Sequence, residues 1–220
     1  MTIRILCDFD GTVTEHDNII ALMQEFAPPE KFEPLKQGVL DRSLSIQSGV
    51  GQMFQLLPSS QKQDYIDFLM KRAVIRPGFD TLLAFAKSNE IDFSIVSGGI
   101  DFFVQPILAD VLTDEAIYCN GSDFSQETVR IEWPHSCDSA CTNQCGCCKT
   151  SIARKLKQNG DTIIAIGDSV TDFELAKQAD HVYARDYLIT LCEQHGIPYT
   201  PFETFHDIIH DLHSRQEVMT

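Results

Sequence analysis

The sequence predicts an α/β protein with a doubly wound, Rossmann-like parallel sheet and a helical cap inserted after the first strand. Three short apolar runs have the pattern of buried strands: IRILC (3–7), DFSIV (92–96) and TIIAI (162–166). Runs that are apolar on both faces are typical of parallel sheets. Helical patterns separate the last two runs, and strands that alternate with helices favour a doubly wound fold.

The stretch between the first two strands is too long for a single crossover helix and predicts the cap. Residues 17–27 and 44–57 carry apolar side chains at helical spacing, and a third helical pattern covers 59–73. The chain is thereby divided into a core domain of residues 1–14 and 74–220 and a cap domain of residues 15–73.

The rest of the chain continues the α/β pattern with one exception. Residues 115–133 have the pattern of a β-hairpin rather than a βαβ step. A cysteine-rich loop follows and ends at Lys149, where a helix is expected to begin. Other helices are expected at 79–88, 101–110 and 168–179, with one or two more between 183 and 214.

Composition and charge exclude several partners. The formal net charge is −15, from 17 Lys+Arg against 32 Asp+Glu, which argues against binding to nucleic acid or anionic lipid. The start, MTIRILCDFDG, has neither the pattern of a signal peptide nor that of a membrane span, so we expect a cytoplasmic protein with no membrane partner. In that reducing compartment the eight cysteines are expected to be thiols or metal ligands. No oligomeric state is predicted.

Functional side chains follow all three predicted strands. Asp8 and Asp10 come after the first, Ser97 after the second, and Asp168 and Asp172 after the third. Ligands of open α/β sheets bind outside the carboxyl ends of the strands, so these side chains should converge. Carboxylates brought close together repel one another unless a cation lies between them, and a small all-oxygen site favours Mg²⁺.

These residues resemble the four sequence motifs of the haloacid dehalogenase superfamily, and of its phosphatases in particular. DFDGT (8–12) is similar to the first motif, Ser97 in IVSGG to the second, Lys149 to the third and GDSVTD (167–172) to the fourth. All four occur in the family's order. The resemblance implies a phosphatase that acts on a small phosphate ester.

The resemblance also implies opposite roles for two neighbouring carboxylates. Asp8 would attack phosphorus as the nucleophile and form an aspartyl-phosphate, whereas Asp10 would act as general acid and then as general base. Mg²⁺ would be held by Asp8, by the main-chain carbonyl of Asp10 and by Asp168.

Charge stabilisation of the transferring phosphate is expected from two other segments. Ser97 and the amides of Gly98 and Gly99 precede a predicted helix and would form an anion-binding corner. Lys149 would supply a fixed cation beside it, and Asp172 would steer that lysine or a metal-bound water.

Five cysteines lie close together in the loop before Lys149 and leave two interpretations open. They lack the paired C-x₂-C spacing of zinc knuckles, yet four thiolates, or three with His135, could complete a tetrahedral metal site. A structural zinc and a metal-free packing role are equally consistent with the spacing. The residues are Cys137, Cys141, Cys145, Cys147 and Cys148.

The cap is expected to select the substrate. Asp17 stands where phosphoserine phosphatases carry an acid, but residues 49–58 lack the basic residue that would pair with a substrate carboxylate, which disfavours phosphoserine. Met53 and Phe54 could instead hold a thioether tail. Segments such as DGTVTEHDNII (10–20) and NQCGCCK (143–149) are similar to a branch of the superfamily whose substrate, in methionine salvage, is a methylthio-substituted enol phosphate.

Three alternatives stay open at this point. Within the phosphatases, the substrate could be another small phosphomonoester such as phosphoserine. Outside them, the chain could be a non-catalytic phosphate or metal sensor that is phosphorylated at Asp8 without rapid turnover. It could also be an interaction protein organised around a zinc-loaded cysteine loop.

Overall fold

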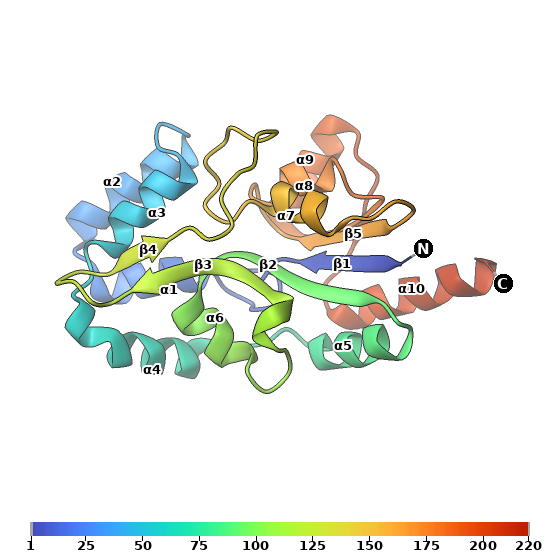
Figure 1. Ribbon diagram of the computed structural model, residues 1–220, viewed down its shortest axis with the longest axis horizontal. Coiled ribbons are helices and arrows are strands. Elements are labelled where there is room, and N and C mark those ends of the chain that lie inside the picture. The colour runs from blue at the N-terminus through green and yellow to red at the C-terminus, as the bar shows by residue number, and fades with distance from the viewer. Residues whose placement is uncertain (1, 220) are drawn as a thin grey trace.

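The structure is a computed structural model that describes residues 2–219 and contains a single twisted sheet (Figure 1). Within these residues the sheet has seven strands in the order β4-β3-β2-β1-β5-β6-β7. All neighbouring strands are parallel except β3 and β4. The strands are β1 (Ile3–Cys7), β2 (Asp92–Ile100), β3 (Ile117–Asp123), β4 (Arg130–Glu132), β5 (Thr162–Gly167), β6 (His181–Ala184) and β7 (Thr200–Pro201).

The apolar runs at 3–7, 92–96 and 162–166 form three adjacent strands at the centre of the sheet, with β1 between β2 and β5. Ile5, Leu6 and Cys7 of β1 are almost completely buried although they alternate between the two faces. Helices must therefore cover both faces, as expected of a parallel sheet.

Two groups of helices cover the sheet (Figure 1). On one face lie α5 (Phe79–Ser88), α6 (Asp101–Leu108) and α10 (Phe205–Met219), and on the other lie α7 (Lys149–Leu156), α8 (Phe173–Ala176) and α9 (Asp186–His195). The predicted doubly wound α/β fold is confirmed. Among the described residues, no helix combines the length and the apolar character needed to cross a bilayer.

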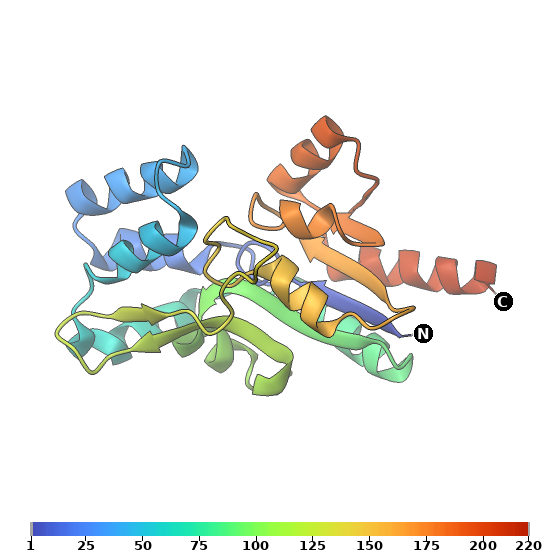
Figure 2. The same ribbon diagram turned by 45° about the horizontal axis from the view of Figure 1, so that its top comes forward.

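Four helices follow β1 in the segment predicted to be the cap, and they lie beside the β3–β4 end of the sheet (Figures 1 and 2). They are α1 (Asn18–Phe26), α2 (Pro29–Leu40), α3 (Ile46–Phe54) and α4 (Lys62–Arg72). The sequence interpretation missed α2, because Pro34 lies inside this helix and Phe32 is its one large buried apolar side chain.

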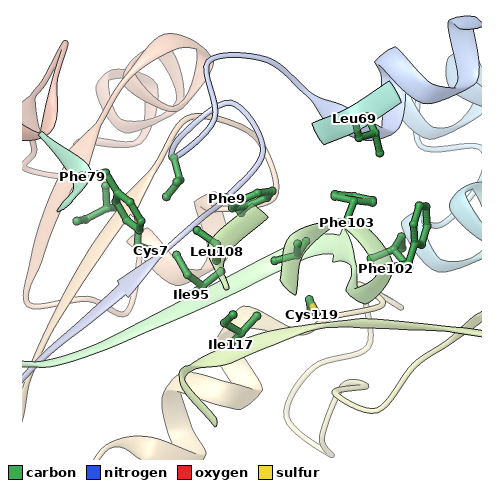
Figure 3. Packing of buried hydrophobic residues seen from close by; sticks show 14 of the residues in the cluster. Cys7, Phe9, Leu69, Phe79, Ile95, Phe102, Phe103, Leu108, Ile117 and Cys119 are labelled. Atoms are coloured by element: carbon green, nitrogen blue, oxygen red, sulfur yellow. The ribbon is translucent and has the colours of Figure 1, made fainter. Parts of the chain in front are cut away.

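The chain enters and leaves the cap through two paired linkers. Thr14 and Ile75 form an isolated antiparallel bridge, and the amide of Arg76 donates to the carbonyl of Val13 at 2.8 Å. The main hydrophobic cluster runs without interruption from core to cap, and Figure 3 shows Leu69 of α4 close to Phe103 of α6. The division into a core of 1–14 and 74–220 and a cap of 15–73 stays a prediction, since the two parts share one apolar cluster.

Two local expectations need correction. The predicted hairpin at 115–133 exists as β3 and β4. However, β3 also pairs in parallel with β2, and α6 connects these two strands, so the segment completes a βαβ step as well. The helix expected at 168–179 is the short α8, because residues 168–172 form a turn in which the Asp172 carboxylate accepts the amides of Asp168 and Ser169, at 3.2 and 3.1 Å. Strands β6 and β7 were not predicted.

Candidate active site

The predicted functional residues meet where the strand order reverses beside β1. Asp8 follows β1 and Asp168 follows the neighbouring strand β5. In doubly wound sheets the crevice outside the carboxyl ends at this switch point is the usual ligand site. Lys149, the first residue of α7, extends into the same place from the helix that precedes β5.

A buried lysine joins two carboxylates at the centre of the site. The Nζ atom of Lys149 lies 2.7 Å from Oδ1 of Asp8 and 2.5 Å from Oδ1 of Asp172. The three side chains are between 3% and 6% exposed, so the charges interact through protein and not through water. Burial alone would lower the pKa of Lys149, but the two carboxylates together raise it, and the amine keeps its proton. This contact is consistent with the expected steering of Lys149 by Asp172, which stays a prediction.

Three acidic groups crowd this position in the way expected of a cation site. Carboxylate oxygens of Asp8, Asp168 and Asp172 all lie within 4.8 Å of one another. Burial and the charge of Asp172 raise the pKa of Asp8 to about 6, while Lys149 partly offsets them. Burial and the charges of Asp8 and Asp172 raise the pKa of Asp168 to about 9. Hard oxygen donors that repel one another fit a small divalent cation such as Mg²⁺.

Asp10 lies outside this group of three carboxylates and has hydrogen-bond partners of its own. Its Oδ1 atom accepts hydrogen bonds from the amide and the Nδ2 group of Asn18, at 3.0 and 2.6 Å. Burial and the nearby charge of Asp17 raise the pKa of Asp10 well above its usual value despite these bonds. The pKa values of Asp8 and Asp10 are thus both raised, and their roles as nucleophile and proton donor stay predictions.

The predicted anion-binding corner lies in an extension of β2. The strand continues to Ile100 with a register irregularity after Val96. The amide of Gly99 was expected to be free, which is wrong: it donates to Oγ of Ser97 at 2.8 Å, because the short serine side chain turns back along the strand. The Ser97 hydroxyl still has its own proton to donate. No heavy atom lies within 4 Å of the place that a Cβ of Gly98 would occupy, so Gly98 faces open space.

Side chains that the sequence interpretation did not single out hold the loops of the site. Arg76, which is buried, donates from Nε to the carbonyl of Thr12 at 2.8 Å and from Nη2 to that of Gly11 at 3.0 Å. Thr12 donates to Oδ1 of Asp168 at 3.2 Å. Asn120 donates to the carbonyl of Gly98 at 2.7 Å. The bonds to main-chain carbonyls carry no sequence signal, because any residue offers a carbonyl.

The cap residues singled out from the sequence lie in different surroundings. Asp17 is exposed and caps α1 by accepting the amide of Ile20 at 2.9 Å, and its charge acts on Asp10. Met53 and Phe54 belong to the main hydrophobic cluster, with exposed fractions of 3% and 0%. Phe54 and Met53 thus support the cap from within, and their contact with a substrate stays a prediction.

The five cysteines of the loop before Lys149 separate into two sets. Sγ atoms of Cys137, Cys141, Cys145 and Cys148 all lie within 4.8 Å of one another. Cys147 belongs instead to a small apolar cluster, with its Sγ atom 3.6 Å from the carbonyl of Tyr118. The inclusion of Cys147 as a candidate metal ligand is therefore wrong.

The fold and the site together define a hydrolase of one superfamily. Residues 5–177 match the model of the haloacid dehalogenase-like hydrolase family, and the chain belongs to this family. Solved structures agree on the fold: a phosphoserine phosphatase with a phospho-aspartyl intermediate analogue superposes with a TM-score of 0.72 at 17% identity, covering 95% of this chain and 98% of that one. A phosphoserine phosphohydrolase-like protein from Francisella tularensis superposes with a TM-score of 0.70 at 16% identity, covering 96% and 99% of the two chains.

Sequence relatives within the family are far more similar. A protein of Exiguobacterium sibiricum named 2-hydroxy-3-keto-5-methylthiopentenyl-1-phosphate phosphatase is 85% identical over 98% of this chain and 99% of its own length. Proteins with the same name from Geobacillus kaustophilus and Bacillus cereus are 54% and 52% identical, covering 98% and 99% of this chain and 97% and 99% of their own lengths.

Proposed function

We propose that the protein is a Mg²⁺-dependent phosphatase that hydrolyses 2-hydroxy-3-keto-5-methylthiopentenyl-1-phosphate to 1,2-dihydroxy-3-keto-5-methylthiopentene and phosphate, in the cytoplasmic methionine salvage pathway. One observation carries the chemistry: buried Lys149 lies 2.7 Å from Asp8. Asp10, two residues further along the chain, has a pKa well above its usual value. An ionised nucleophile and a protonated acid are the two groups that the first step of phosphoester transfer needs.

In the first half-reaction a carboxylate oxygen of Asp8 attacks phosphorus. The bond between phosphorus and the enol oxygen breaks as the new bond forms, and Asp10 gives its proton to the departing oxygen. The raised pKa of Asp10 suits this donation. Lys149 and the Ser97 hydroxyl stabilise the charge on the transferring group, for which Gly98 leaves open space.

In the second half-reaction water attacks the phosphorus atom of the phosphorylated Asp8. Asp10, now ionised, takes a proton from the water, and the bond between phosphorus and the aspartate oxygen breaks. Phosphate and free Asp8 result. The hydrogen bonds from Asn18 at 3.0 and 2.6 Å orient Asp10 for both proton transfers.

Mg²⁺ fits the donors that the site presents. The carboxylates of Asp8 and Asp168 and the main-chain carbonyl of Asp10 would hold it, and Thr12 orients Asp168. When bound, the ion supplies positive charge that offsets the repulsion between an anionic nucleophile and an anionic ester.

The substrate assignment is supported by the relatives and by the cap. Relatives that are 51% to 85% identical over at least 94% of this chain carry one substrate in their name. Helices α1 and α3 contain no lysine or arginine, so neither offers a partner for the carboxylate of phosphoserine. The similarity to phosphoserine phosphatases at 16% to 17% identity supports the fold alone.

Phosphate release by the purified protein tests the proposal. With Mg²⁺, kcat/KM for the methylthio enol phosphate should exceed that for phosphoserine by at least 10³-fold, because a substrate carboxylate buried without a partner is strongly rejected. EDTA should abolish turnover, and so should Asp8→Asn. Asp110→Asn changes an exposed aspartate and serves as the matched control. Turnover by Asp8→Asn, or a preference for phosphoserine, would overturn the chemistry or the substrate, respectively.

A further inference from the structure

Four of the eight cysteines form a compact sulfur cluster outside the active site. Cys137, Cys141 and Cys145 are partly buried and Cys148 is fully buried. Their Sγ atoms lie within 4.8 Å of one another, and those of Cys141 and Cys145 are 3.9 Å apart. The cluster lies in the irregular loop between β4 and α7, which Figure 2 shows between the cap helices and α7.

The spacing of the sulfur atoms is that of a tetrahedral metal site. A zinc–sulfur bond of about 2.3 Å places the sulfurs of a tetrahedral site about 3.8 Å apart. The 3.9 Å between Cys141 and Cys145 lies near that value and the other pairs are within 4.8 Å, whereas bonded sulfurs would lie about 2 Å apart. All eight cysteines are free thiols in the structure. Sulfurs this close leave room for one ion and not for a cluster of several metal atoms.

Hydrogen-bond donors already point at the sulfur atoms. The amide of Cys145 donates to Sγ of Cys137 at 3.5 Å, and the hydroxyl of Ser151 donates to Sγ of Cys148 at 3.0 Å. The Ser151 hydroxyl is itself oriented by the amide of Asp138, at 3.0 Å. Such donors orient metal ligands and favour the ionised form of a thiol. The N-terminal end of α7, where Cys148 occupies the N-cap position, favours negative charge as well.

The loop connects the sulfur cluster to the active site on one side and to the cap on the other. Lys149, which contacts Asp8, directly follows Cys148. The carbonyl of Gln144 accepts the amide of Gln47 in α3 at 3.1 Å. Fixing the positions of these sulfur atoms would therefore also restrict Lys149, which is the next residue, and α3, which is one hydrogen bond away.

We propose that Cys137, Cys141, Cys145 and Cys148 bind one zinc ion, which fixes the loop that carries Lys149 to Asp8. On binding, each thiol loses its proton to solvent and its sulfur forms one bond to the metal. Soft thiolate donors select zinc over the hard Mg²⁺ of the catalytic carboxylates, so one chain holds two different divalent ions. The role of the zinc in positioning Lys149 rests on the proposed phosphatase function, whereas zinc binding does not.

Metal analysis of the intact protein, purified without added zinc, tests the site. We expect about one zinc per chain in the wild type and in Asp8→Asn, and less than about one tenth in Cys141→Ser and Cys145→Ser, because a tetrahedral site needs all four ligands. Cys147→Ala is the matched control from the same loop and should keep its zinc. Since Asp8→Asn lacks turnover by design, zinc in this variant separates the site from the proposed function.

A second measurement covers the case in which the serine variants fail to fold. Titrating the wild type with an organomercurial should release about one zinc, in step with the modification of four thiols. Cobalt exchanged into the site should show sulfur-to-metal charge-transfer absorption. A wild-type protein without metal, with iron in place of zinc, or with disulfides at these positions would overturn the proposal, as would full zinc content in Cys141→Ser.

The positioning role has its own readout. Cys145→Ser should lower kcat by roughly tenfold to a hundredfold, as is typical for the loss of groups that orient a functional side chain. In a Lys149→Met background the same change should have almost no further effect on kcat, because the lysine that the loop positions is gone. An equal loss in both backgrounds would show that the zinc supports the fold in general and would overturn the positioning role.

Discussion

Replacing Lys149 with methionine removes the ammonium group between Asp8 and Asp172 while keeping a side chain of similar length. At 2.7 Å and an effective dielectric constant of about 20, one such ion pair has a Coulomb energy of about 6 kcal/mol, much of which the desolvation of buried charges offsets. Breaking a buried pair typically lowers the free energy of unfolding by about 3–5 kcal/mol. We expect a loss of about 3 kcal/mol at neutral pH.

The loss of stability should depend on pH in a defined direction. Asp8, whose pKa is already about 6 with the amine present, takes up a proton more readily without it. The variant therefore buries one charge fewer at pH 5 than at pH 8. Its loss of unfolding free energy relative to the wild type should accordingly be smaller at pH 5. Denaturant unfolding at the two pH values measures this difference.

Lys149→Met should lower kcat much more than its loss of folding stability would by itself. Removal of one preorganised charge-stabilising group lowers kcat by about 10²–10³-fold. Lys155→Met, which removes an exposed lysine of the same helix, should stay within about twofold of the wild type. A Lys149→Met protein that is folded and retains more than a third of wild-type kcat would refute the role assigned to the amine.

Three further predictions concern the loops and the metal. Gly11→Ala should lower kcat and weaken Mg²⁺ binding, because Gly11 has a φ of +82° and a Cβ there would lie 2.5 Å from Oδ2 of Asp168. Titrating activity with Mg²⁺ measures this, and an unchanged Mg²⁺ dependence would contradict it. Arg76→Met should lower the free energy of unfolding by about 2 kcal/mol or more in denaturant titrations, since it leaves buried carbonyls of the active-site loop without donors; a loss under 0.5 kcal/mol would contradict it. An acid whose pKa rises on folding destabilises the fold once it ionises. For Asp8 without metal, the free energy of unfolding should therefore fall by about 3 kcal/mol as the pH rises from about 4 to about 6. The increase in Tm on adding Mg²⁺ should accordingly be several degrees larger at pH 8 than at pH 5, and an equal increase at both would count against the cation site.

Local patterns were sufficient for the central part of the fold. The apolar runs at 3–7, 92–96 and 162–166 are strands because they are apolar on both faces, and parallel order at the centre follows from the helices between them. The same patterns did not reveal β6 and β7, which are only four and two residues long, or α2, which contains Pro34. Short or interrupted elements form because neighbouring elements pack against them, and a local pattern does not record that.

The sequence by itself determined which chemistry was available: Asp8, Asp168 and Lys149 follow strands or begin a helix, and the topology of a parallel sheet brings such positions together. Only the tertiary structure decided which partner each group has. Arg76 holds the loop that follows Asp8 through main-chain carbonyls, and Cys147 turns into the core while adjacent Cys148 joins the sulfur cluster. The reason is physical: residue type fixes what a side chain can bind, whereas the direction of the backbone at that residue fixes what it reaches.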